Sequence, residues 1–205
     1  MVAVWERIRY NDISKGERNM NFDPENKIHF ENVDENYEHL DLLDAINMEA
    51  FPSVERLPLK ALAAINDVQQ LRLKAVVDGE VPVGFMIWFE LGEGFNYLAY
   101  LAIDPQYRNR KYGSKTLNHI FDDVLAGEVN FGAIEALNPN ADNYEQRLAR
   151  KRLYEKLGFI ILDNVIETPK NGSYQLLYHG PETKEEVLMD KLNKIMELIK
   201  KLFNS

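Results

Sequence analysis

The sequence predicts a mixed α/β fold, in which a twisted central sheet is flanked by helices. Two observations carry this prediction: strand-like apolar runs alternate with segments of helical spacing, and three of the strand-like runs follow one another through short glycine turns. The 205 residues, 45% of them hydrophobic, can fill one sizeable core. We therefore expect one domain with appendages.

The segment 27–65 is expected to hold one strand and two short helices. The strand candidate spans 27–33, and helical spacing follows over 40–50 and again over 57–65. We expect Ser53 to cap the second helix, because a serine side chain can accept a hydrogen bond from an unpaired backbone N–H group.

Residues 71–103 should form an antiparallel meander. The runs LRLKAVV and VPVGFMIWFEL flank Asp78-Gly79, which is a hairpin turn signal. A second turn at Gly92-Glu93-Gly94 leads into a nearly uncharged strand over 95–103.

Helices and strands alternate in the rest of the chain. The expected elements are a helix over 112–126, a strand over 131–137, a helix over 144–157 and two strands near 159–165 and 173–178. This order places helices against a sheet.

We divide the chain into three parts. Residues 1–26 are a polar leader expected to be loosely ordered, residues 27–180 form the main domain, and residues 181–205 form an amphipathic helix with apolar residues spaced 4-3-4-3. Packing of this helix on its own domain is the first interpretation. A homodimer helix and a membrane-surface helix are the alternatives.

Composition argues against several classes of function. Without cysteine there is no disulfide framework and no thiolate chemistry, and the four histidines show no metal-ligand spacing, so no metal is expected. The sequence has no apolar run of membrane-spanning length and no leader-peptide pattern, which predicts a cytoplasmic protein without a membrane span. The net charge of −9 disfavours nucleic-acid binding and mildly favours a cationic partner.

A cationic loop joins the strand over 95–103 to the next helix. The N–H groups of a first helical turn lack intrahelical partners and the positive end of the helix dipole faces outward, so the loop should attract a phosphate or pyrophosphate. The residues expected to bind it are Arg108, Asn109, Arg110, Lys111, Tyr112, Gly113 and Ser114. An ordinary solvated loop is the alternative, and the Walker pattern of a nucleotide hydrolase is absent.

A second motif, RLYEKLGF at 152–159, follows the strand that ends in ALNPN at 136–140. Together with the cationic loop, these segments resemble the GCN5-related N-acetyltransferase (GNAT) family, over about residues 28–180. The phrase AFPSVER at 50–56 is similar to a first-helix segment of some members. The resemblance implies a largely antiparallel sheet with one splayed parallel pair of strands.

The acetyl-CoA loop of that family reads roughly Arg/Gln-x-x-Gly-x-Gly/Ala. This sequence matches it at Arg108 and Gly113 and departs from it at Lys111, where the first glycine is usual.

The resemblance implies transfer of an acetyl group from acetyl-CoA to a primary amine of a small molecule or peptide, by direct attack on the thioester. Main-chain groups of Leu101, Ala102 and Ile103 would bind the pantetheine arm and polarise the thioester carbonyl. Tyr154 occupies the family position whose hydroxyl can donate a proton to the CoA thiolate. The structural alternative is a tyrosine that only packs beside Phe159.

The general base has no direct counterpart, because the strand over 95–103 carries no acid. The candidates are glutamates that could act through water: Glu135, Glu49 and Glu55. Asn138 lies where relatives hydrogen-bond the pantetheine, although its spacing to Tyr154 exceeds the usual one. The basic segment between them could contact the CoA ribose phosphate or simply lengthen the helix.

The acceptor stays open. The first two helices, Tyr97, Tyr100 and the final strands are expected to form its wall, and overall acidity favours a cation. Two other function classes also stay open: a non-catalytic acetyl-CoA-binding or sensing module, and an interaction protein that assembles through the C-terminal helix.

Overall fold

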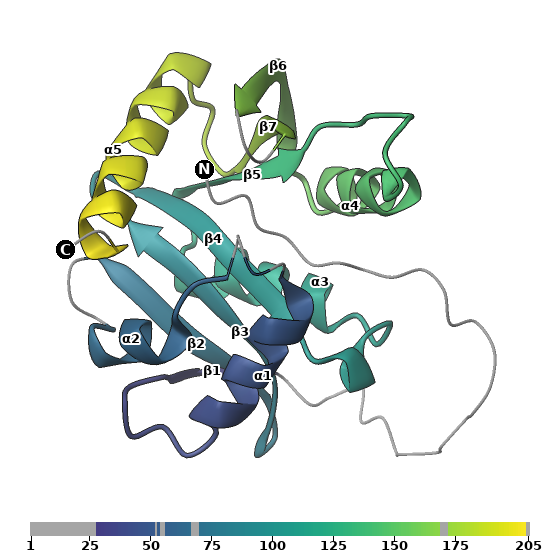
Figure 1. Cartoon of the computed structure of the whole chain (residues 1–205). Coiled ribbons are helices and arrows are strands. Elements are labelled where there is room, and N and C mark those ends of the chain that lie inside the picture. The colour runs from purple at the N-terminus through teal and green to yellow at the C-terminus, as the bar shows by residue number, and fades with distance from the viewer. Residues whose placement is uncertain (1–27, 52, 54–55, 67–69, 169–171, 204–205) are drawn as a thin grey trace.

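The computed structural model describes residues 28–51, 53, 56–66, 70–168 and 172–203, and it confirms the mixed α/β fold (Figure 1). Seven strands form one sheet in the order β1-β2-β3-β4-β5-β7-β6. Neighbouring strands are antiparallel except β4 and β5, which are parallel. The predicted leader, residues 1–26, and Glu55 lie outside the described residues.

The described strands are β1 (His29–Asn32), β2 (Leu71–Asp78), β3 (Val81–Glu90), β4 (Phe95–Ile103), β5 (Val129–Glu135), β6 (Ile160–Thr168) and β7 (Gly172–His179). The helices are α1 (Leu40–Ala50), α2 (Leu59–Ala64), α3 (Tyr112–His119), α4 (Tyr144–Lys156) and α5 (Glu185–Phe203). A 3-10 turn, η1 (Pro105–Tyr107), precedes α3, and a π-helical turn, η2 (Ile120–Val124), continues it.

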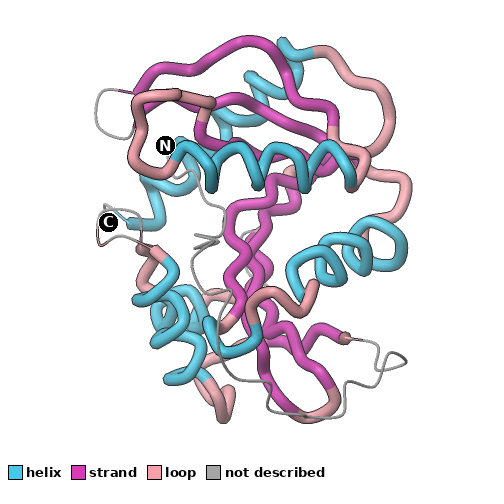
Figure 2. Tube along the Cα trace, turned by 90° about the vertical axis from the view of Figure 1, so that its right-hand side faces the viewer, coloured by secondary structure: helices cyan, strands magenta, loops and turns pink. Residues whose placement is uncertain are grey.

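Helices cover both faces of the sheet, as Figure 2 shows with helices on either side of the strands. Buried side chains of α1, α2 and α5 pack with one face in a single hydrophobic cluster. Those of α3, η2 and α4 pack with the other face in a second cluster. Because both faces are covered, β3 and β4 are buried almost along their whole length rather than in alternation.

The C-terminal helix α5 is part of the first hydrophobic cluster. Leu188, Leu192 and Ile195 are at most 1% exposed and pack in that cluster with side chains of the sheet. Among the described helices, none is both long enough and apolar enough to cross a membrane.

Two expectations for local structure are wrong. Ser53 does not cap α2, which begins at Leu59 after Pro58, a residue whose fixed φ suits a helix start. Strand β5 begins two residues before the predicted range, because Val129 and Asn130 pair with the start of β4.

Candidate functional site

The two parallel strands separate after a short common start. Their ladder joins three residue pairs and ends at Tyr97 and Phe131, beyond which no pair links β4 to β5 in the described part of the chain. Strand β4 then leads to α3 and β5 leads to α4, so the strands diverge toward these two helices (Figure 1). The predicted splayed pair is therefore present, and we call the space between the diverging strands the V.

Buried amides hold the closed end of the V. Asn96 and Asn130 are each 1% exposed, and Asn96 Nδ2 donates to Asn130 Oδ1 at 3.3 Å. Asn130 Nδ2 in turn donates to the Glu128 backbone oxygen at 3.1 Å. Polar groups this deeply buried are stable only when paired, so they fix where the parallel ladder begins.

The predicted thioester-binding residues Leu101, Ala102 and Ile103 lie on β4 beyond the last parallel pair. Their other edge pairs with β3, and the pairing skips Ala99, which marks a bulge in β4. Bulges bend a strand and increase its twist. The main chain of these three residues thus lines the V, where a backbone donor could face a ligand.

The loop before α3 has an unusual backbone. Asn109 and Lys111 both have positive φ, at 64° and 63°. Lys111 is also the N-cap of α3, and its left-handed conformation is one that glycine adopts without steric cost. The position where the family usually has glycine therefore keeps the glycine-like conformation although it carries a lysine.

The N-terminus of α3 has no side-chain cap among the described residues. Its first backbone bond runs from Lys115 N to Lys111 O at 2.9 Å, so the N–H groups of Tyr112, Gly113 and Ser114 precede the helical pattern. Arg110 and Lys111 are exposed beside them. An uncapped N-terminus with adjacent cations is suited to bind an anion.

Tyr112 anchors the start of α3. Its hydroxyl donates to Asp78 Oδ2 at the end of β2. Burial, reinforced by that carboxylate, raises the pKa of Tyr112 to about 12. This residue therefore stays protonated and structural at neutral pH.

Arg108 points toward α1 rather than toward the first turn of α3. Its Nη2 and Nη1 atoms contact the Glu49 carboxylate at 2.5 and 3.3 Å, and its Nε donates to the Ile103 backbone oxygen at 3.3 Å. The Arg108 side chain is 12% exposed and that of Glu49 is 48% exposed. No local sequence pattern could predict this pair, because 59 residues separate its members.

Tyr154 lies in the last turn of α4 and is 3% exposed. Phe159 N donates to Tyr154 O at 3.0 Å and Gly158 N donates to Glu155 O at 3.1 Å, with Gly158 at φ +85°. These bonds form a Schellman motif, and the Tyr154 and Phe159 rings, 5.1 Å apart, make its hydrophobic contact. The YEKLGF run is thus first a helix-ending motif, one that fixes Tyr154 in place.

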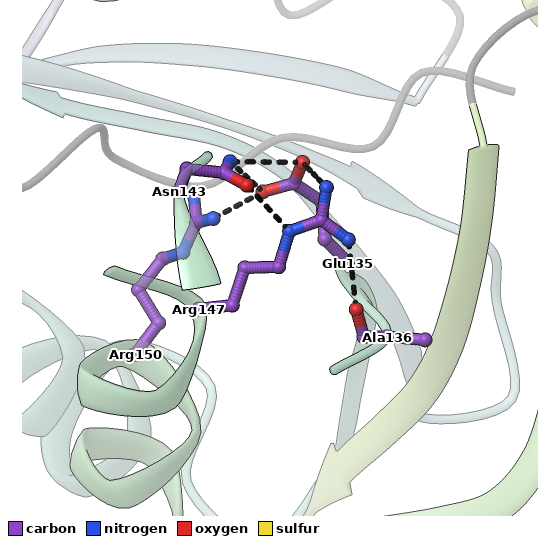
Figure 3. Close-up of polar contacts among 5 residues, drawn as sticks. All are labelled: Glu135, Ala136, Asn143, Arg147 and Arg150. Carbon is purple, nitrogen blue, oxygen red and sulfur yellow. Dashed lines mark hydrogen bonds and ion pairs between the residues drawn. The ribbon is translucent and has the colours of Figure 1, made fainter. Parts of the chain in front are cut away.

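Glu135 ends β5 and is held by three side chains of the α4 region (Figure 3). Arg147 Nη2 lies 3.1 Å from Glu135 Oε1, Arg150 Nη2 contacts Oε2, and Asn143 Nδ2 lies 3.4 Å from both oxygens. Glu135 thus lies at the end of β5, beside the V, with its carboxylate occupied.

The other predicted residues are less well placed for ligand contact. Asn138 is exposed, and its Oδ1 accepts from Asn140 N at 3.0 Å in a local turn. Tyr97 and Tyr100 are 1% and 0% exposed, in ring contact with Phe131 and Phe51, so the expectation that they line an acceptor wall is wrong.

No group of three or more histidine, aspartate or glutamate side chains in the described ranges is arranged to hold a metal ion.

Comparison with known proteins agrees with this geometry. A family model described as the acetyltransferase (GNAT) domain matches residues 72–161, a range that includes β4, the loop, α3, β5 and α4. The family resemblance is thereby confirmed, and residues 72–161 form an acetyltransferase domain of the GNAT family. Acetyltransferases of this family are enzymes that take their acetyl group from acetyl-CoA. The curated protein sequences include no match to the chain.

Solved structures share the fold at low identity. A Bacteroides thetaiotaomicron protein assigned to the GNAT family is 19% identical, with a TM-score of 0.69 over 83% of this chain and 97% of that chain. An aminoglycoside 6′-N-acetyltransferase complexed with coenzyme A is 17% identical, with a TM-score of 0.57 over 76% and 99% of the two chains. The ribosomal-protein-S18-alanine N-acetyltransferase from Escherichia coli is 18% identical, with a TM-score of 0.55 over 77% and 97%.

Proposed function

We propose that this protein transfers an acetyl group from acetyl-CoA to a primary amine by direct attack of the amine on the thioester. The observation that carries this proposal is the combination of the V with the uncapped N-terminus of α3 at the end of β4. The helix N-terminus and its cations suit the pyrophosphate of CoA, and the V gives the pantetheine arm a path between the strands.

The roles of individual residues follow from their positions. Backbone N–H groups of Leu101, Ala102 and Ile103 would stabilise the negative charge that develops on the thioester oxygen. Tyr154 would donate a proton to the departing CoA thiolate. An amine is itself a nucleophile once deprotonated, so the chain needs to supply only position and proton transfer. This fits a protein without cysteine.

The loop residues Asn109, Arg110, Lys111, Tyr112, Gly113 and Ser114 are proposed to contact the pyrophosphate, with Arg108 as a further contact. Asn138 is proposed to hydrogen-bond the pantetheine. The conformation of Lys111 bears on the alternative of a non-catalytic module, which the missing glycine had suggested. Because Lys111 keeps the left-handed backbone at φ 63°, the loop shape does not depend on glycine here.

The acceptor is proposed to be a cationic small molecule or a peptide amine. The net charge of −9 supports a cation. Two structurally similar proteins are an aminoglycoside acetyltransferase and a ribosomal-protein alanine acetyltransferase, which defines two kinds of amine to try first. A cytoplasmic location and a homodimer remain predictions of the sequence.

The test is amine-dependent release of CoA thiol, followed with a thiol-reactive dye. The chain has no cysteine, so the protein adds no background to this assay. The panel comprises a polyamine, an aminoglycoside and a peptide with N-terminal alanine, each with and without protein. We expect release with at least one amine. Acetyl-CoA binding without release on any amine would favour the non-catalytic module, and absence of binding would favour the interaction protein.

A further inference from the structure

The carboxylate of Glu135 has both of its oxygens in contact with nitrogen donors of the α4 region. It receives four contacts within hydrogen-bond distance, two on each oxygen, from Asn143, Arg147 and Arg150. An ionised carboxylate offers about four lone-pair sites. Glu135 is therefore poorly suited to the role of general base that its place on β5 suggested.

Arg147 of α4 uses each of its guanidinium nitrogens, and two of them reach residues at the end of β5 (Figure 3). Its Nε donates to Asn143 Oδ1 at 2.8 Å, and its Nη1 donates to the Ala136 backbone oxygen at 2.8 Å. Its Nη2 lies 3.1 Å from Glu135. A planar guanidinium used at every nitrogen fixes both the distance and the angle between the elements that it joins.

Arg150, which also contacts Glu135, extends this constraint on α4 to the turn that holds Tyr154. Arg150 and Tyr154 are the buried residues of α4, 7% and 3% exposed, and they lie four positions apart, so they share one face of the helix. The Schellman motif at Gly158 fixes the far end of the same turn. The ion pair of Arg150 and the Schellman motif thus together fix how α4 is rotated about its axis at Tyr154 and how far along the axis Tyr154 lies.

We propose that Glu135, Arg147 and Arg150 form a clamp that positions Tyr154 at the open end of the V. Glu135 is then a positioning residue that acts through α4, not the base that deprotonates the amine. The inference rests on the proposed function for the role of Tyr154, whereas the clamp itself is a feature of the structure alone.

The experiment is a double-mutant cycle in the full-length protein, with Glu135→Gln, Tyr154→Phe and the combined variant. Displacement of a catalytic group by about 1 Å can cost about 100-fold, so we expect Glu135→Gln to lower kcat by roughly 10- to 100-fold. The KM for acetyl-CoA should stay within about twofold, because the pyrophosphate loop lies on β4 and α3. If Glu135 acts only through Tyr154, adding Glu135→Gln to Tyr154→Phe should lower kcat no further.

A matched control is Glu186→Gln, which changes an exposed glutamate in the first turn of α5, a helix outside the clamp. It should leave kcat unchanged. Arg150→Lys keeps the charge but loses the planar fork, and we expect it to show part of the fall in kcat that Glu135→Gln shows. It tests the clamp independently if Glu135→Gln folds poorly.

Two outcomes would overturn the clamp. In the first, the losses of kcat in Glu135→Gln and Tyr154→Phe multiply in the combined variant, and the activity of Glu135→Gln recovers at high pH. This is the behaviour expected when a general base has been lost. The other is a kcat unchanged in both Glu135→Gln and Arg150→Lys.

If the parent protein turns over no amine, the proposed function fails and amide hydrogen exchange takes the place of kinetics. The clamp then predicts faster exchange in α4, and not in α3, of Glu135→Gln. Unchanged exchange in α4 would contradict it.

Discussion

A single backbone conformation explains how the proposed acetyl-CoA loop tolerates Lys111. A lysine at φ 63° bears the steric cost of its Cβ, which glycine would avoid, and it gains a positive charge at the helix N-terminus in return. Sequence comparison by residue type alone treats this lysine as a mismatch, whereas the conformation makes it a charged variant of the same turn.

Replacing Lys111 should separate the effect of backbone strain on stability from the effect of the positive charge on acetyl-CoA binding. Lys111→Gly is expected to raise the free energy of unfolding by up to about 1 kcal/mol, and Lys111→Ala to leave it nearly unchanged. Both variants should weaken acetyl-CoA binding to a similar extent, because both lose the charge. Urea unfolding and calorimetric titration measure the two effects, and equal stabilities of the Gly and Ala variants would speak against strain at this position.

The hydroxyl of Tyr154 is the group that we expect to protonate the CoA thiolate. Tyr154→Phe keeps the ring contact with Phe159 and removes only the hydroxyl, so the fold should persist. We expect kcat to fall by about 10²-fold, at the low end for a general acid because a thiolate is a tolerable leaving group. Steady-state kinetics test this, with Tyr144→Phe at the start of the same helix as control. A kcat equal to that of the parent would assign Tyr154 to packing.

His179 should make the fold sensitive to mild acid. Its ring stacks on Phe121 at 4.4 Å, and burial lowers the pKa of His179 below its ordinary value of 6.5, with Asp122 acting weakly in the opposite direction. The unfolded chain therefore takes up the proton first. Stability should fall as pH drops through about 6.5, and level off once the lower pKa of the folded state has been passed.

Urea midpoints at several pH values measure this effect. His179→Phe should reduce the loss of stability between pH 7.5 and 5.5, whereas substitution of His29, which is 48% exposed, should not. An equal acid response in His179→Phe and the parent would show that the sensitivity arises elsewhere.

At the scale of elements, the sequence predicted the order of strands and helices well, because their apolar periods are strong. It predicted boundaries less well: β5 begins at Val129 through its pairing with Phe95, a contact that no local pattern encodes. The second helix starts at Leu59, two residues after the predicted start and without the expected cap from Ser53, for a local reason, namely the proline before it.

The C-terminal helix α5 shows how a long-range contact settles an ambiguity. Its stripe predicted either packing in its own domain, assembly or membrane contact. In the structure Lys191, 8% exposed at its side chain, pairs with Glu93 at 2.7 Å and lies 4.8 Å from the ring of Phe95. Four residues of the stripe, Leu188, Leu192, Ile195 and Ile199, are buried in the first hydrophobic cluster, so this helix stabilises the same core as the sheet.

Removing one side chain from this interface should be costly. Leu192 is 1% exposed, and Leu192→Ala is expected to lower the free energy of unfolding by about 2–5 kcal/mol. Glu197→Ala, an exposed change on the same helix, should have little effect. Urea unfolding of the two variants compares them, and a cost below about 1 kcal/mol for Leu192→Ala would mean that α5 is docked only loosely.

At the scale of the molecule, the site combines parts that are distant in sequence. The loop and the family motif could be predicted because each is a short local pattern. The Glu49–Arg108 pair and the clamp on Glu135 could not, because they depend on how α1 and α4 pack against the ends of β4 and β5. Both findings concern glutamates that sequence reasoning offered as bases, and both show those carboxylates bound to arginine.

The V and the N-terminus of α3 together form the proposed acetyl-CoA site. Gly113 is in the first turn of α3, and a valine there would place a branched side chain where a phosphate approaches. Asn193→Val, an exposed change in α5, controls for the effect of a β-branched residue in a helix.

The most direct measurement is calorimetric titration of acetyl-CoA into the parent protein, Gly113→Val and Asn193→Val. We expect saturable binding to the parent and to Asn193→Val, and a loss of affinity of at least tenfold in Gly113→Val with the fold intact. Equal affinity in Gly113→Val and the parent, or no binding to the folded parent, would contradict it.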